Sequence, residues 1–243
     1  MYITHRQELD MVEIGSQEPA DHTPGLTLHA AFLYDLTVWL MTLGRERNFR
    51  EKLLRLAGLK PGETVLDVGC GTGSLAIAAK RWVGPAGSVF GIDASPEMLA
   101  RAQKKARKAG LDIIFHTAAA QALPFDQGKF DLVLNTLMLH HLPRKSREQC
   151  AQEISRVLKP GGCVLVLEFS APGGNQHGLL SRFHRHGGMS LGDMIALFRG
   201  QGLHIKDSGE LDFAGMQFLI ATRAAGHRGM CIELARNTNS LPC

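Results

Sequence analysis

The sequence lacks the features that mark several large classes of protein. Its five cysteines are odd in number and form no C-x-x-C pair, so neither a disulfide framework nor a zinc site is indicated, and no metal is expected. The first ten residues show no basic segment followed by an apolar run, which argues against a secretory signal and makes a reduced cytoplasm the expected location. The net charge of +4 is mild, so no nucleic-acid partner is expected.

No apolar run reaches the length of a membrane span. The longest, residues 26–43, is interrupted by His29 and Asp35 and predicts an amphipathic helix. Two interpretations stay open: the helix packs onto the core, or it lies in a membrane interface. In the second case the protein is peripheral to the inner face of the membrane.

One basic run stands out on a predicted helix, where it alternates with alanines. We read it as a solvated face, with RNA or anionic lipid as the alternative partners; its members are Arg101, Lys104, Lys105, Arg107 and Lys108.

Apolar strands and amphipathic helices alternate along most of the chain. Expected strands are 64–68, 88–92, 112–116, 130–135, 163–169, 203–209 and 215–222, and expected helices are 27–43, 45–57, 74–82, 96–110, 143–158 and 190–200. This order predicts an α/β, Rossmann-like fold: a seven-stranded, mostly parallel sheet with helices on both faces and an N-terminal helical cap. The predicted boundaries are a flexible tail (1–24), the cap (25–60), the core (61–223) and a C-terminal tail (224–243).

The most informative segment is the glycine-rich run at residues 65–73, Val-Leu-Asp-Val-Gly-Cys-Gly-Thr-Gly. A dinucleotide site needs G-x-G-x-x-G, but here the spacing is G-x-G-x-G and Ser74 stands where a third glycine belongs. Asp67, two residues before the first glycine, would repel a diphosphate and attract an ammonium group. The run therefore predicts a ligand with an amine and an adenosine but no phosphates, which describes S-adenosylmethionine.

A second acidic residue follows at the end of the next expected strand. Asp93 lies twenty residues after Gly73, where a carboxylate can accept both hydrogen bonds of a ribose diol. The alternative, a helix-capping carboxylate, is less favoured because Ser95 suits that position. Ligands of open parallel sheets lie beyond the carboxyl ends of the strands, so these residues are expected at one edge with the 119–123 loop, Asn135 and Glu168.

Six segments follow one another in a familiar order: 67–73 (DVGCGTG), 91–95 (GIDAS), 122–125 (ALPF), 130–131 (FD), 139–142 (LHHL) and 156–162 (RVLKPGG). They resemble the successive motifs of class I S-adenosylmethionine-dependent methyltransferases, nearest to the ubiquinone/menaquinone-biosynthesis C-methyltransferase-like group. The resemblance covers about residues 30–222. It implies S-adenosylmethionine as cofactor and S-adenosylhomocysteine as product.

The resemblance also implies site residues. Asp67 and the loop residues Gly69, Cys70, Gly71 and Gly73 would bind the methionine portion. Asp93 and Ala94 would bind the ribose, and Ala119, Ala120 and Gln121 would border the adenine. The backbone carbonyl of Asn135, at the end of the fourth strand, would lie by the sulfonium. Relatives often carry Asp-Ala at the adenine. This chain has Ala119 in place of the aspartate, so it lacks a carboxylate for the adenine amine at that position. Tyr34-Asp35 matches a Tyr-Asp pair of the cap helix, from which Tyr34 would close over cofactor and substrate.

Candidate catalytic residues besides Tyr34 are the two histidines after the fourth expected strand. A base helps only if the acceptor loses a proton, and histidine is the natural base near neutral pH. The resemblance implies that one of His140 and His141 faces the cofactor and the other supports the fold, in an order that stays open. Glu168 either orders the acceptor or satisfies loop amides. The 171–189 loop, which holds His184 and His186, is shorter and less aromatic than in the quinone enzymes.

The expected function is methyl transfer from S-adenosylmethionine, by in-line displacement, to a small-molecule acceptor such as a quinol, a phenol, a lipid or a related metabolite. The alternatives are a non-catalytic S-adenosylmethionine-binding scaffold, a hydride-transfer enzyme and an RNA methyltransferase. The sequence after the fourth strand, Asn135-Thr-Leu-Met138, lacks the Asn/Asp-Pro-Pro-Tyr pattern of base N-methylation.

Overall fold

The structure is a computed structural model that describes residues 46–170, 189–211 and 215–225. Several expectations lie outside these residues: the N-terminal tail, the helix at 27–43 with Tyr34 and the membrane interface, nearly all of the 171–189 loop, and the C-terminal tail. The division of the chain into four parts accordingly stays a prediction.

The described residues form a seven-stranded sheet in the order β3-β2-β1-β4-β5-β7-β6. β7 runs antiparallel to both of its neighbours, and the pairings among β1 to β5 are parallel. The strands are β1 (Thr64–Val68), β2 (Ser88–Asp93), β3 (Ile114–Thr117), β4 (Phe130–Thr136), β5 (Leu158–Phe169), β6 (Leu203–Leu211) and β7 (Met216–Arg223). The predicted α/β class and the mostly parallel sheet are confirmed.

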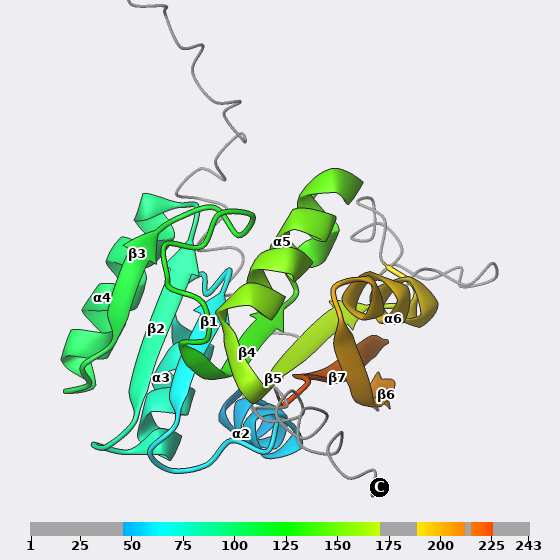
Figure 1. The fold of residues 1–243 in the computed structure, drawn as a ribbon. Helices are drawn as coiled ribbons and strands as arrows, with labels where there is room; N and C mark the ends of the chain where they lie inside the picture. The colour runs from blue at the N-terminus through cyan, green and yellow to red at the C-terminus, as the bar shows by residue number, and fades with distance from the viewer. Residues whose placement is uncertain (1–45, 171–188, 212–214, 226–243) are drawn as a thin grey trace, which may run out of the picture.

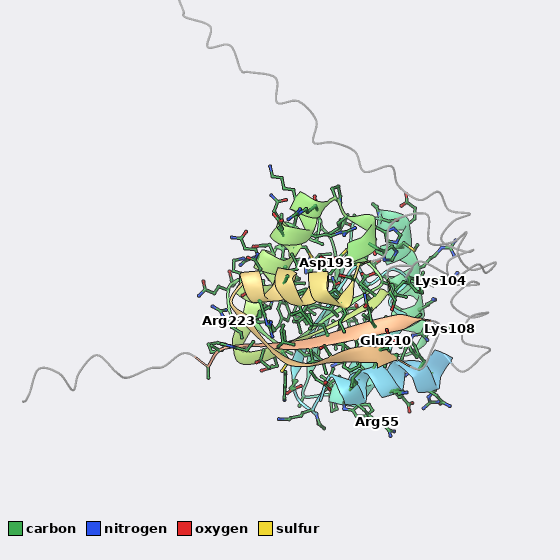
Figure 2. The ribbon with its side chains drawn as sticks, turned by 90° about the vertical axis from the view of Figure 1, so that its right-hand side faces the viewer. Arg55, Lys104, Lys108, Asp193, Glu210 and Arg223 are labelled. Carbon is green, nitrogen blue, oxygen red and sulfur yellow. The ribbon has the colours of Figure 1, made fainter. Side chains whose placement is uncertain are left out.

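Helices cover both faces of this sheet (Figure 1). α2 (Glu46–Leu56) and α3 (Ser74–Val83) pack on one face against side chains such as Leu134 and Leu165. α5 (Arg144–Val157) and α6 (Leu191–Gly200) pack on the other against Val133 and Val166. Seen from the β6 edge, α6 lies above the strands and α2 below them (Figure 2). α4 (Pro96–Lys108) lies beside α3. One apolar cluster is buried on each face of the sheet.

One predicted boundary is clearly wrong, and others differ by one or two residues. The helix expected at 143–158 runs Arg144–Val157, with Pro143 as its cap residue, and the strand expected at 112–116 runs Ile114–Thr117. The run 159–162, expected to end that helix as a turn, belongs to β5, which starts at Leu158 instead of Cys163. The register between β4 and β5 shifts between Phe130 and Leu132, and such an irregularity accommodates a proline and two glycines in a strand.

The parallel register brings the ends of the central strands to one edge. Val68 of β1 pairs with Ile92 of β2 and with Asn135 of β4, and Asn135 pairs with Val166 of β5. The loops that leave β1, β2, β4 and β5 consequently start side by side. Across residues 46–170, 189–211 and 215–225, none of the helices is both long enough and apolar enough to span a bilayer.

Candidate functional site

The glycine loop between β1 and α3 is shaped by three residues with positive φ. Gly69, Gly71 and Gly73 have φ of 73°, 53° and 74°, a region that costs other residues energy. The N–H groups of Gly69 and Cys70 both donate to the Ile92 carbonyl, at 2.9 and 2.8 Å. The loop is thereby tied to the end of β2.

The three glycines serve different purposes. A Cβ on Gly69 would stand 2.5 Å from Cγ of Met138, and one on Gly73 would stand 2.8 Å from Cβ of Ala102 in α4. A Cβ on Gly71 would meet no described atom within 4 Å. Gly69 and Gly73 therefore permit close packing, whereas Gly71 leaves open space over the backbone that a ligand can approach.

A lysine of α4 holds the far end of the loop. The Lys105 ammonium donates to the hydroxyl oxygens of Thr72 and Ser74, at 2.7 and 3.3 Å. One member of the basic run is therefore a structural anchor.

Asp67 is buried beside the loop and is 1% exposed. Within the described part of the chain, neither of its carboxylate oxygens has a hydrogen bond of standard geometry, although the Ala76 N–H lies close enough to act on its charge. Burial raises the pKa of Asp67 to about 7; the Asp93 charge adds to the shift, while the Ala76 backbone amide and the Arg50 charge oppose it. A buried carboxylate without a hydrogen bond is costly unless a cation or a donor joins it, so the residue fits the ammonium group of an amino acid.

Asp93 lies at the end of β2 and already holds two backbone groups. Its Oδ2 accepts the Gly71 N–H at 2.8 Å and its Oδ1 accepts the Ser95 N–H at 2.9 Å. Each ionised oxygen keeps a further lone pair, so a ribose diol can still donate to both. Ser95 caps α4, accepting the Met98 N–H at 3.3 Å, as predicted.

The segment expected at the adenine follows β3. Ala119 and Ala94 are exposed, while Ala120 and Gln121 are half-buried. The loop is fixed behind them, because Glu153 accepts the Leu123 N–H at 2.7 Å and Arg156 donates to the carbonyls of Leu123 and Phe125. The methyl side chain of Ala119 offers no hydrogen bond, so a polar contact to an adenine at that position would come from the backbone.

Asn135 lies in the interior at the end of β4. It is 0% exposed, and neither polar atom of its amide has a partner in the residues described. Asp67 pairs with Leu134, one position earlier, so the side chains of Asp67 and Asn135 point to opposite faces of the sheet. The sequence implied a role only for the carbonyl of Asn135, because a single asparagine at a strand end does not indicate whether its side-chain amide is buried.

Glu168 organises the turn that follows β4. Its Oε1 accepts the N–H groups of Met138 and Leu139, at 2.9 and 2.6 Å. Its Oε2 lies 2.6 Å from Nδ1 of His140. Of the two readings left open, satisfying loop amides is therefore observed, and the same carboxylate also holds a histidine.

The two histidines have different surroundings. The His140 side chain is 13% exposed and rests on Glu168, whereas His141 is an exposed residue whose ring lies 3.9 Å from that of His140 between centroids. The Arg147 guanidinium donates to the carbonyls of Leu139 and Leu142, at 2.9 and 2.8 Å, and closes the turn from α5.

The structure thus gathers at one edge the glycine loop, both acidic residues, the 119–123 loop, Asn135, His140 and Glu168. Tyr34 lies outside the described residues. Within the described ranges, no group of three or more histidine, cysteine or acidic side chains could hold a metal. The roles assigned to these residues remain predictions.

Comparisons with known proteins identify relatives in sequence and in fold. Residues 65–162 match the model of a family described as a methyltransferase domain. The chain is 38% identical over 151 residues to a demethylmenaquinone methyltransferase of Thermus thermophilus, covering 62% of this chain and 67% of that protein. It is 39% identical over 141 residues to the Lactobacillus johnsonii demethylmenaquinone methyltransferase, covering 57% of each. The chain therefore spans less than two thirds of the length of the Lactobacillus johnsonii protein.

Solved structures share the fold. A methyltransferase from Aquifex aeolicus, described as S-adenosylmethionine-dependent, superposes with a TM-score of 0.60 at 24% identity, covering 71% of this chain and 88% of the other. The [4+2]-cyclase SpnF superposes with a TM-score of 0.64 at 21% identity, covering 74% and 82%.

Fold and site together define a Rossmann-like, cofactor-binding α/β protein of the methyltransferase type. The chain belongs to the class I S-adenosylmethionine-dependent methyltransferases, and its similarity to the menaquinone-pathway relatives confirms the resemblance noted in the sequence.

Proposed function

We propose that this chain transfers a methyl group from S-adenosylmethionine to a small-molecule acceptor. The observation that carries the proposal is the buried Asp67 carboxylate, whose oxygens have no hydrogen bond of standard geometry among the described residues. It comes two residues before the glycine loop, in which Gly71 has open space around it. An amino-acid ammonium would supply the missing partner.

The same carboxylate argues against a phosphate-bearing cofactor. An acid at the position of Asp93 suits the ribose of either cofactor, so the distinction rests on Asp67. Its carboxylate would repel a pyrophosphate, whereas it would attract the ammonium group of S-adenosylmethionine. This favours methyl transfer over the hydride-transfer alternative.

The protein would speed the reaction mainly by positioning the cofactor and the acceptor. Asp67 would hold the ammonium, Asp93 the ribose diol, and the 119–121 segment the adenine edge. The cofactor supplies a methyl carbon on a positively charged sulfur, which is a good leaving group. Holding an acceptor in line with that carbon, in a site without water, can contribute roughly 7–11 kcal/mol of the barrier reduction.

The acceptor is proposed to be a quinol-like or phenolic small molecule, since the matched relatives are named for methylation of demethylmenaquinone. We further propose a cytoplasmic location with peripheral membrane contact through residues 26–43. Sedimentation of the full chain with anionic vesicles, compared with a variant lacking residues 1–45, tests that contact; equal binding of both forms contradicts it.

Isothermal titration calorimetry tests the cofactor. We expect binding of S-adenosylmethionine and S-adenosylhomocysteine to the wild type and no binding of NAD. The reverse result would overturn the proposal. A panel of phenols, quinols, thiols, amines and lipids, scored by release of S-adenosylhomocysteine, then tests transfer. Cofactor binding without release from any acceptor would favour the scaffold alternative.

A further inference from the structure

We propose that His140 and Glu168 form a proton-accepting pair, and that the acceptor is therefore an acidic O–H or activated C–H compound. His140 would take the proton through Nε2, and Glu168 would act as a positioning residue that sets the tautomer of the imidazole. The inference rests on the proposed methyl transfer and adds to it a class of acceptor.

The geometry of the pair carries the argument. The Glu168 side chain is completely buried, and its Oε2 lies 2.6 Å from His140 Nδ1. Its other oxygen accepts two backbone N–H groups, so both carboxylate oxygens have partners in a site without exposure to water. A carboxylate accepts hydrogen bonds and cannot donate them.

The tautomer of His140 follows from that carboxylate. With Glu168 as the carboxylate, which only accepts, the proposal puts the proton of the neutral imidazole on Nδ1 and leaves the lone pair on Nε2. A partner on Nδ1 also fixes the orientation of the ring. The His140 side chain is 13% exposed, and its turn follows β4 at the sheet edge from which the cofactor loop also leaves.

Few other charged groups face this ring. Glu168 comes from β5, His141 lies beside it in the same turn, and the Arg147 guanidinium of α5 donates to the His140 carbonyl at 3.4 Å. Phe169 contacts the ring edge, with centroids 5.9 Å apart. Arg147 points to the backbone oxygen of His140, and the carboxylate is thus the charged group bonded to the imidazole.

The proposed proton transfer balances without a further reactant. The acceptor O–H or C–H bond breaks, and its proton binds the lone pair of His140 Nε2. The electron pair left on the acceptor forms the bond to the methyl carbon, and the pair of the carbon–sulfur bond goes to sulfur. The positive charge ends as an imidazolium stabilised by Glu168, and its proton later leaves to water.

A base of this kind matters for one class of acceptor. Phenols, quinols and enolisable ketones are weak nucleophiles until they lose a proton, and a positioned base typically contributes about 10²–10⁴-fold. Amines and thioethers attack through a lone pair that is already present. The pair therefore favours the first class.

Glu168→Gln is the informative variant. A glutamine can keep accepting the Met138 and Leu139 amides through its oxygen, while its NH₂ group faces His140 Nδ1. That nitrogen must then accept, and the imidazole proton moves to Nε2, where it blocks proton uptake. Glu210→Gln and His204→Gln, both at exposed positions on the β6 edge strand, are the matched controls (Figure 2 labels Glu210).

Nitrogen-15 NMR of histidine-labelled full-length protein reads the tautomer without any acceptor. The signal lost in His140→Gln assigns the residue. We expect Nδ1–H in the wild type and in both controls, and Nε2–H in Glu168→Gln. An Nε2–H tautomer in the wild type overturns the proposal, and so does an unchanged tautomer in Glu168→Gln.

A series of phenols with falling pKa, together with a 1,3-diketone, provides the kinetic test. For acceptors that are neutral at the assay pH, we expect Glu168→Gln and His140→Gln to lower kcat at least about 100-fold. The loss should shrink toward threefold for phenols already ionised. Equal losses across the series would mean a structural role only and overturn the inference.

The two proposals fail differently. Failure to bind S-adenosylmethionine defeats methyl transfer itself. Cofactor binding with transfer only to amines or thioethers leaves methyl transfer standing and defeats the proton-accepting pair. If Glu168→Gln does not fold, as judged by its unfolding midpoint, His140→Gln carries the kinetic test alone.

Discussion

Asp93 Oδ2 accepts the Gly71 N–H at 2.8 Å, so the acid expected to bind the ribose also fixes the middle of the glycine loop. The last residue of β2 thereby sets the position of the turn that leaves β1. A ligand that donates to Asp93 would meet a carboxylate already oriented by Gly71 and Ser95.

Replacing Asp93 should weaken the cofactor strongly. Asp93→Asn removes the charge and presents an NH₂ group to one of the two backbone donors. Hydrogen bonds to charged groups contribute about 1.5–3 kcal/mol, so we expect the calorimetric Kd for S-adenosylhomocysteine to rise roughly 10- to 150-fold. The exposed Asp112→Asn is the control. A Kd within twofold of wild type in Asp93→Asn would remove this residue from the site.

Cofactor affinity should fall at acidic pH. Burial raises the pKa of Asp67 to about 7 in the free protein, and an ammonium partner would favour its ionised form. Below pH 7, binding must therefore expel a proton, and Kd should rise by up to tenfold per pH unit. Calorimetry at pH 6 in two buffers of different ionisation enthalpy measures proton release. Identical heats in both buffers would show that Asp67 does not titrate on binding.

Asp67→Asn should stabilise the free protein while weakening the cofactor. An aspartate in an unfolded chain has a pKa near 3.9, whereas here burial raises the pKa of Asp67 to about 7. Between these pH values the folded protein holds a proton that the unfolded chain has lost, so the free energy of unfolding contributed by this group falls as pH rises.

The asparagine variant has no such titration. Urea unfolding should show its stability rising relative to wild type between pH 5 and pH 8, by on the order of 2–4 kcal/mol. A constant difference over this range would contradict a buried, titrating Asp67. The exposed Asp112→Asn should leave the wild-type profile unchanged.

Two glycine substitutions should separate packing from binding. In Gly73→Ala the new methyl group would stand 2.8 Å from Cβ of Ala102 and also suffer positive φ, so we expect unfolding to become easier by about 2–4 kcal/mol. Gly71→Ala has space around its methyl group and should lose only about 1 kcal/mol. Its cofactor Kd should nevertheless rise at least tenfold, because the methyl enters the open space. Equal effects of both variants on Kd and stability would contradict this division.

The sequence predicted the sheet and its edge because both depend on local patterns. Each strand is a short apolar run that ends in a turn residue, and the parallel order places the strand ends together. The capping role of Ser95 was also predictable, since a serine followed by a proline and an acid has a local meaning.

The sequence could not predict contacts that join distant segments. Glu168 and His140 are far apart in the chain, and their 2.6 Å contact depends on the β4–β5 register. The choice between His140 and His141 likewise depends on which ring faces β5. The predicted start of β5 was wrong for a similar reason. A proline and two glycines indicate a turn when read alone, but pairing with Phe130 of β4 extends the strand through them.

Met138 lies between the two parts of the site, the glycine loop after β1 and the histidine turn after β4, and can couple ligand binding at one to binding at the other. Its N–H is held by Glu168, and its side chain lies over Gly69, so one residue touches both the histidine turn and the cofactor loop. We expect an allosteric linkage in which filling one half changes the affinity of the other, and such a linkage is reciprocal by thermodynamic necessity. Truncation in Met138→Ala should reduce it: an acceptor that tightens cofactor binding in the wild type would tighten it less in the variant, as calorimetry with and without that acceptor would measure.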